Sequence, residues 1–276
     1  MHIGLVTPSF PPMVDGGVAI ATGRLVQYLL RYGHQITVLT QPPPAETPAA
    51  AEPSWASSSA LTITYRAIDA PLHDAAGVAA LQRWMQARHA RCPFDVLLAY
   101  FVYPSGYLAT RLGDAIGVPV VCSCRGNDIT KDMFIDPATL AAVLQRSTRL
   151  IFVSDSLRRM AHTLTPCREK STIVANSVDC TQFTPAPASS PAPSAPVVLG
   201  TSGLMRWKKG IDVLLPLIRE LCATRDVQLH IAGYALDDEI DRQMTQFVNR
   251  HGLRDRVHIL GPLPHERMVD VLRQMD

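Results

Sequence analysis

The chain has 276 residues, of which 47% are hydrophobic and 18% are charged. Its net charge is only +2, from 26 basic and 24 acidic side chains, which argues against nucleic acid as the main partner. No apolar run reaches the roughly 18 residues that a membrane-spanning helix needs, and the first residues lack the pattern of a signal peptide. The six cysteines show no metal-ligand spacing. We therefore expect a cytoplasmic globular protein with reduced thiols and no bound metal.

Short apolar runs alternate with amphipathic stretches along the chain, which is the pattern of an α/β protein with parallel sheets. The expected strands cover residues 2–6, 35–40, 61–66, 96–100, 118–123, 150–153, 197–201, 228–232 and 257–260. The expected helices cover residues 18–32, 75–91, 105–116, 137–146, 155–164, 210–224, 237–251 and 264–275.

A segment rich in Pro, Ala and Ser interrupts this alternation. Residues 185–196 read PAPASSPAPSAP, the composition of an extended connector between domains. We predict a Rossmann-like N-terminal domain over residues 1–184, a linker over 185–196 and a C-terminal domain over 197–276. The last of these offers three strands where a doubly wound sheet usually has five or six, so we expect it to be incomplete.

A basic turn follows the first expected strand of the C-terminal domain. Residues 203–210 read GLMRWKKG and lead into a helix. A helix N-terminus has unpaired N–H groups and attracts anions. Arg206 and Lys209 add a guanidinium and a point charge, a pair that suits a diphosphate. The alternative is that these are solvated charges in an ordinary βα turn.

Three further candidate segments follow expected strands. Gly16 and Gly17 end a long proline-rich loop, which differs from the tight dinucleotide fingerprint, and they would let a ligand approach a helix N-terminus. Arg125 and Asp128 follow the strand at 118–123, where ligands of open parallel sheets bind; alternatively, Asn127 or Asp128 caps the next helix. Asn176 lies in a similar position before the linker.

Together these segments resemble the retaining glycosyltransferases of family 4, which have the two-domain GT-B architecture. The segments that carry the resemblance occur in the family's order, and they are Pro11-Pro12 with Gly16-Gly17, Arg125-Gly126-Asn127-Asp128, Val153-Ser154-Asp155-Ser156-Leu157, Asn176-Ser177-Val178-Asp179, and Gly203 with Lys209-Gly210.

The resemblance implies transfer of a sugar from a nucleotide-sugar donor to a glycan or lipid-linked acceptor, with retention and without cofactor or metal, in polysaccharide or glycoconjugate biosynthesis. It also implies roles for the candidate residues. The donor phosphates and the surrounding cleft are assigned to Gly16, Gly17, Asn176, Arg206 and Lys209, and the catalytic positions beside the reacting sugar or acceptor to Arg125 and Asp128.

The chain departs from the family pattern at three points. Leu204 stands where many members have Arg, and Arg125 stands where many have His. The acidic E-x7-E segment is absent, so we expect this chain alone to be inactive or weakly active. Two other functions stay open: a nucleotide-sugar 2-epimerase of similar architecture, and a non-catalytic truncated fragment that only binds.

One helix suggests contact with a membrane surface. At helical spacing Arg83, Arg88 and Arg91 share one face with Trp84, a combination that suits an anionic membrane and a lipid-linked acceptor. We therefore expect peripheral contact at the inner membrane face as an addition to a cytoplasmic location. The alternative is a solvated face with Trp84 tucked under its neighbours.

Overall fold

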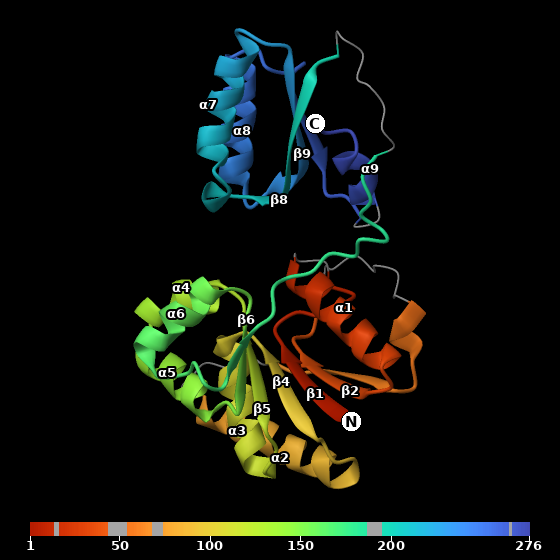
Figure 1. Ribbon diagram of the computed structural model, residues 1–276, viewed down its shortest axis with the longest axis vertical. Helices are drawn as coiled ribbons and strands as arrows, with labels where there is room; N and C mark the ends of the chain where they lie inside the picture. Colours follow the sequence, from red (N-terminus) through yellow and green to blue (C-terminus); the bar gives the residue numbers. More distant parts are fainter. Residues whose placement is uncertain (14–16, 44–53, 68–73, 187–194, 265–266) are drawn as a thin grey trace. The chain divides into compact units, whose positions relative to one another are not determined.

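The structure is a computed structural model that describes residues 1–13, 17–43, 54–67, 74–186, 195–264 and 267–276 (Figure 1). The chain divides into two compact units, Met1–Asn176 and Ser177–Asp276, and each is described by itself. Most of the linker predicted over 185–196 lies outside the described residues, so the predicted domain limits stay predictions.

The first unit is built on a parallel sheet of seven strands in the order β3-β2-β1-β4-β5-β6-β7. The strands are β1 (His2–Thr7), β2 (Gln35–Thr40), β3 (Leu61–Tyr65), β4 (Val96–Tyr100), β5 (Val120–Cys124), β6 (Arg149–Phe152) and β7 (Ser171–Ile173). The helices are α1 (Gly17–Arg31), α2 (Ala75–Arg91), α3 (Tyr107–Ile116), α4 (Asn127–Thr130), α5 (Pro137–Arg146) and α6 (Asp155–Leu164). Short helical turns cover Ser54–Ser57, Val102–Gly106 and Asp132–Phe134.

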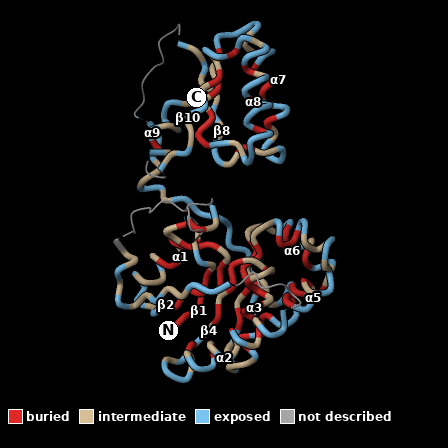
Figure 2. Tube along the Cα trace, turned by 180° about the vertical axis from the view of Figure 1, so that it is seen from behind, coloured by how far each residue is buried: buried red, intermediate tan, exposed pale blue. Residues whose placement is uncertain are grey.

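Helices cover both faces of this sheet, so its strands are the most buried part of the unit (Figure 2). Successive strand residues point to opposite faces. Leu5 packs in the cluster that includes Val26 of α1, whereas Val6 packs in the larger cluster with α2, α3, α5 and α6. The predicted α/β fold is thereby confirmed for this unit.

The second unit has a parallel sheet of three strands in the order β10-β9-β8. Its elements are β8 (Val197–Met205), a short turn at Trp207–Lys209, α7 (Ile211–Cys222), β9 (Val227–Ala235), α8 (Asp238–Arg250), β10 (Val257–Gly261) and α9 (Met268–Leu272). Side chains of α7 and α8 form one apolar cluster with the strands. The second sheet is therefore small, as predicted.

The strand that leads into the basic turn is longer than expected. We predicted residues 197–201, but β8 continues to Met205, opposite Ala235 of β9. Met205 is buried at 1% exposure, and this burial extends the strand through Gly203. Since glycine usually signals a turn, the sequence pattern ended the strand too early. The basic turn is thus shorter, from Arg206 to Gly210.

The helix that we expected to form a basic face turns one of its arginines inward. Arg88 of α2 donates to Thr37 Oγ1 at 3.4 Å and lies 6.0 Å from the ring centre of Phe94. Trp84 packs against the main core cluster, as the alternative interpretation expects. Of the three arginines, only Arg83 and Arg91 are exposed, so the predicted face of three arginines and a tryptophan is reduced to these two charges.

His2 is a buried polar residue at the start of β1. Its two ring nitrogens lie 2.9 Å from the carbonyl oxygen of Pro93 and 2.9 Å from Thr37 Oγ1, and its ring stacks on Phe94. Burial lowers the pKa of His2; the nearby positive charge of Arg88 also lowers it, while the carbonyl of Pro93 and the carboxylate of Asp95 oppose the shift.

We expect His2 to make the first unit less stable in mild acid. The unfolded chain takes up a proton near pH 6.5, whereas the folded histidine resists protonation, so stability is lost as the pH falls from about 6.5 toward the lower folded pKa. Urea unfolding at about pH 7.5 and about pH 5.5 measures this loss. The His2→Gln variant, whose side chain cannot titrate, should lose less stability than the wild type between these two pH values. An equal loss in both proteins would contradict the prediction.

Candidate functional site

The first candidate site lies at the edge of the seven-stranded sheet where the parallel strands end. Arg125 follows β5 directly, and Asn176 comes three residues after β7. The Arg125 guanidinium donates to Asn176 Oδ1, and its carbon atom lies 4.6 Å from the ring centre of Tyr100, the last residue of β4. The structure therefore brings together two residues that the sequence placed far apart.

Asp128 lies inside the protein next to this edge and binds its backbone. Its side chain is buried, at 2% exposure, and its carboxylate accepts hydrogen bonds from the backbone N–H groups of Val102 at 3.0 Å, Gly126 at 2.7 Å and Arg125 at 3.1 Å. Burial raises the pKa of this carboxyl, and these three hydrogen bonds oppose the rise. Asp128 thus ties the turn after β5 to the segment after β4.

The described contacts of Asp128 make it a positioning residue for Arg125. All of the hydrogen bonds just given are to backbone groups, so its oxygens already have partners within the protein. This arrangement is related to the predicted helix cap, because the carboxylate holds the first residues around α4. A catalytic role for Asp128 stays a prediction, as does one for Arg125.

Asp128→Ala should destabilise the first unit by about 3 kcal/mol, because three amide groups lose a buried acceptor. Asp132→Ala is the matched control: it removes the same charge from a less buried position of the same segment, and its expected cost is below about 0.5 kcal/mol. Urea unfolding compares the two variants. Equal costs would show that the carboxylate does not hold this edge together.

Sequence reasoning missed the segment that follows β4. Phe101 has φ of 86°, a left-handed conformation that is costly for an aromatic residue. Its N–H donates to the Ser123 carbonyl at 2.9 Å, and its own carbonyl accepts from Gly106 at the same distance. The available signal was the run of aromatic residues at a strand end, Tyr100, Phe101 and Tyr103.

The loop after β1 contains the two glycines predicted to approach a ligand. Gly16 lies outside the described residues. Gly17 is the first residue of α1, it is exposed, and a Cβ built on it would meet none of the described residues within 4 Å. The start of the loop is held by the hydroxyls of Thr7 and Thr22, which both donate to the carbonyl of Ser9 at 3.0 Å. Gly17 thus begins a 15-residue helix without a contact that its missing side chain would disturb in the described part of the chain.

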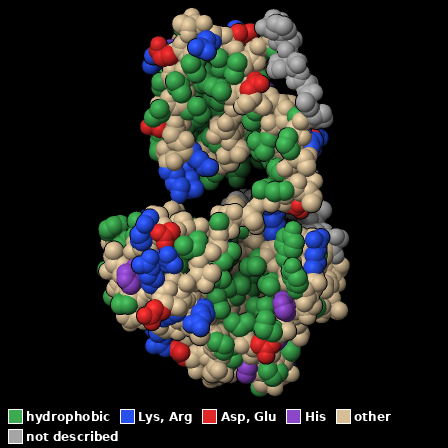
Figure 3. All heavy atoms as spheres, in the orientation of Figure 1, with side chains coloured by type: hydrophobic (Ala, Val, Ile, Leu, Met, Phe, Trp, Pro, Cys, Tyr) green, Lys and Arg blue, Asp and Glu red, His purple; other side chains and the backbone are tan. Residues whose placement is uncertain are grey.

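The second candidate site lies in the second unit, where β8 leads into α7. Basic side chains gather at this end of the unit (Figure 3). The Lys209 ammonium lies above β8, only 3.7 Å from where a Cβ on Gly203 would stand. Gly210, with φ of 71°, turns the chain into α7 immediately after Lys209. The flexible cation Lys209 thus lies beside Gly203 of β8 and one residue before the turn into α7.

Arg206 lies at the start of the same turn, and part of its side chain is buried. Its Nε atom is buried and has no hydrogen-bond partner among the residues that the structure describes. Buried donors are normally paired, and an unpaired one calls for an explanation such as a missing ligand. Asp212, in the first turn of α7, is an opposing negative charge. The turn nevertheless carries three positive charges, on Arg206, Lys208 and Lys209, and this one carboxylate. Its excess of positive charge favours the binding of anions.

A side chain at Gly233 would collide with the backbone of Gly203 on the neighbouring strand. Gly203 pairs with Gly233 of β9, and a Cβ on Gly233 would lie 1.9 Å from the Gly203 carbonyl oxygen. Both residues have positive φ, 108° and 155°. Glycine at both positions therefore lets β8 and β9 stay paired next to the Lys209 turn.

Two comparisons of sequence define the family. Residues 15–182 match Glycosyltransferase Family 4, and residues 183–276 match Glycosyl transferases group 1. The first match alone covers more than half of the chain, so the protein belongs to glycosyltransferase family 4.

Particular relatives share parts of the sequence and the fold. The phosphatidylinositol N-acetylglucosaminyltransferase GPI3 subunit of Saccharomyces cerevisiae is 35% identical over 81 residues, which are 29% of this chain and 17% of the yeast protein. Sucrose-phosphate synthase of Thermosynechococcus elongatus has a TM-score of 0.73 at 16% identity, over 99% of this chain and 73% of that one. Anabaena HepE in complex with UDP-glucose has a TM-score of 0.70 at 16% identity, over 99% of this chain and 72% of that one. At these identities the structures establish the GT-B-like fold alone.

Among the described residues, no helix is both long enough and apolar enough to cross a membrane. Within the same residues, His, Cys, Asp and Glu form no group of three that could hold a metal ion. The acidic run at the start of α8 has a structural role, since the Asp237 carboxylate accepts from the Ile240 N–H at 2.9 Å and caps the helix.

Proposed function

We propose that the protein transfers a sugar from a nucleotide-sugar donor to a glycan or lipid-linked acceptor, with retention of the anomeric configuration, in polysaccharide or glycoconjugate biosynthesis. The observation that carries this proposal is the anion site at the start of α7. There the Lys209 ammonium lies over Gly203, and Arg206 presents a buried N–H without a described partner.

The chemistry of sugar transfer explains why such a site is needed. Cleavage of the bond between sugar and diphosphate leaves negative charge on the departing nucleotide, and fixed cations that meet this charge lower the barrier. Lys209 and Arg206 are our proposed cations. The binding of UDP-glucose by Anabaena HepE, which shares the fold, supports a donor of this chemical class.

The polar edge of the first unit is our proposed place for the reacting end of the acceptor. The Arg125 guanidinium is fixed between Tyr100 and Asn176, and a guanidinium held in this way can present its remaining N–H groups to hydroxyl or phosphate oxygens. The yeast relative acts on phosphatidylinositol according to its name, which supports a lipid-linked acceptor as well as a glycan.

Product analysis separates the three candidate functions. The chain is incubated with UDP-, GDP- and ADP-sugars and simple glycoside acceptors, and NMR follows the anomeric signals. A transferase gives a glycoside of retained configuration, and we expect only slow turnover from this chain. A 2-epimerase would instead convert the donor into its diastereomer, and a binding fragment would leave it unchanged while still binding it. Epimerisation of the donor would overturn the proposed transfer, and binding without any turnover would favour the binding fragment.

A further inference from the structure

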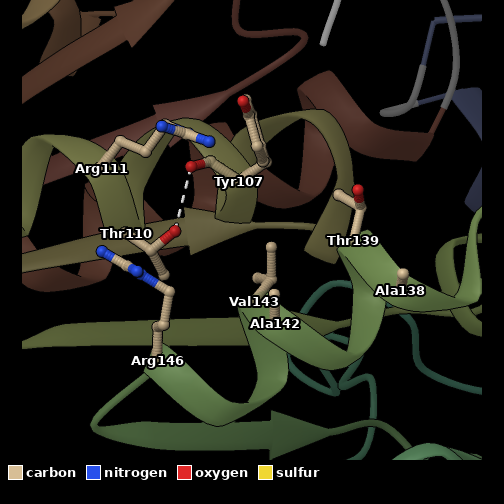
Figure 4. Close-up of a pocket in the computed structure, with 8 residues that line it drawn as sticks. All are labelled: Tyr107, Thr110, Arg111, Ala138, Thr139, Ala142, Val143 and Arg146. Atoms are coloured by element: carbon tan, nitrogen blue, oxygen red, sulfur yellow. Dashed lines mark hydrogen bonds between the residues drawn. The ribbon is translucent and has the colours of Figure 1, made fainter.

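A hollow of about 290 Å³ lies between α3 and α5 of the first unit (Figure 4). The residues of this α3–α5 groove come from both helices, and they are Tyr107, Thr110, Arg111, Ala138, Thr139, Ala142, Val143 and Arg146. None of them belongs to the strand-end site or to the basic turn described above. The groove is therefore a separate feature of the surface.

The floor of the groove is apolar and its rim is polar. Val143 is almost fully buried, and Ala138 and Ala142 lie one helical turn apart on α5, so small side chains leave the space open. The hydroxyl of Thr110 donates to the carbonyls of Gly106 and Tyr107, each at 3.0 Å. Its proton is thus used within α3, and the donors left for a ligand stand at the rim.

The rim carries two guanidinium groups with different partners. Arg111 lies over the Tyr107 ring, 4.5 Å from its centre, and has no ion-pair partner among the described residues. Arg146 forms an ion pair with Asp114. Figure 4 shows Arg111 on α3 and Arg146 on α5, with Thr110 between them and Val143 and Ala142 to one side.

The charges at the rim favour a ligand with a single negative charge. Two guanidiniums and the Asp114 carboxylate leave a net charge of +1. A carboxylate matches this charge and pairs with an arginine fork through two parallel hydrogen bonds, whereas a phosphate dianion would be left partly uncompensated. The volume lies at the lower limit of small-molecule sites, and the apolar floor suits the C–H face of a sugar ring.

We propose that the α3–α5 groove binds a sugar carboxylate, that is, a uronic-acid residue of a glycan. Arg111 binds the carboxylate, Arg146 adds positive charge, and the ring lies on Ala138, Ala142 and Val143. This inference rests on the proposed function only for the natural source of the ligand, an acidic glycan acceptor held away from the reacting end.

Titration by NMR or calorimetry tests the groove with methyl glucuronide as the probe. We expect binding in the millimolar range, about tenfold weaker in Arg111→Gln because a charge-assisted bidentate contact is lost. Arg91→Gln, which removes the same charge from the exposed end of α2, should bind as the wild type does. Because Arg111 is exposed, its replacement should leave the unfolding curve unchanged, and urea unfolding checks this.

Three results would overturn the proposal: no binding of methyl glucuronide, equal binding of neutral methyl glucoside, or equal binding of inorganic phosphate that is also lost in Arg111→Gln. The test is independent of the donor. If the chain binds a nucleotide-sugar but no glucuronide, only the proposal for the groove is wrong. If it binds glucuronide but no nucleotide-sugar, only the proposed sugar transfer is wrong.

Discussion

Gly233→Ala is expected to destabilise the second unit by about 4 kcal/mol, because the new methyl group has no space. A Cβ at this position would lie 1.9 Å from the Gly203 carbonyl oxygen, which is backbone of the neighbouring strand and cannot rotate away. The φ of 155° adds strain for any residue with a side chain. To accept the alanine, β8 and β9 would have to separate just below Lys209.

Gly252→Ala is the matched control for this variant. Gly252 also has positive φ, 65°, but a Cβ there would meet no atom of the described residues within 4 Å, so its expected cost is only the conformational one of about 1 kcal/mol. Urea unfolding, followed by circular dichroism, compares both variants with the wild type. If the two alanines cost the same, the close approach of Gly203 and Gly233 is not what holds these strands in register.

Lys209→Ala should weaken the binding of the nucleotide-sugar about a hundredfold, since a phosphate loses a charge-assisted contact of roughly 2–3 kcal/mol. Lys209 is exposed, so its loss should leave the stability of the unit unchanged. Equilibrium dialysis with a labelled donor measures the change, and the unfolding curve separates lost contact from lost structure.

Lys208→Ala removes the same charge from the next residue and is the control for general electrostatic attraction. We expect its effect to be small and to fade at high salt. Arg206→Ala should also weaken binding, because its buried Nε then no longer serves the ligand. Equal losses of donor affinity in Lys208→Ala and Lys209→Ala would show that the positive charge of the surface attracts the donor in general. This result would contradict the proposed contact between Lys209 and a donor phosphate.

The sequence predicted the fold well where hydrophobic runs and turns agree. Buried strands such as β1 and β4 and amphipathic helices such as α6 were found at their places. The short strand β7 was missed because Ser171-Thr172-Ile173 contains no apolar run. The end of β8 was misplaced because Gly203 signals a turn locally, whereas its pairing with Gly233 is decided by a strand distant in sequence.

The sequence allowed us to predict which residues form the candidate site, but not which of them are in contact. Parallel strands end at one edge, so Arg125 and Asn176 could be expected there. Their contact depends on the order β5-β6-β7, which no local pattern encodes. Likewise, the amide groups that surround Asp128 belong partly to Val102, 26 residues earlier. Tertiary contacts of this kind show Asp128 holding backbone groups of two segments together, while its catalytic role stays a prediction.

The central claim is that this chain recognises a nucleotide-sugar through the turn between β8 and α7. The most direct measurement is calorimetric titration of the folded wild-type chain with UDP-, GDP- and ADP-sugars. We predict micromolar binding of at least one of them, with the heat lost in Lys209→Ala. No binding of any of the three by a chain that circular dichroism shows to be folded would contradict the claim.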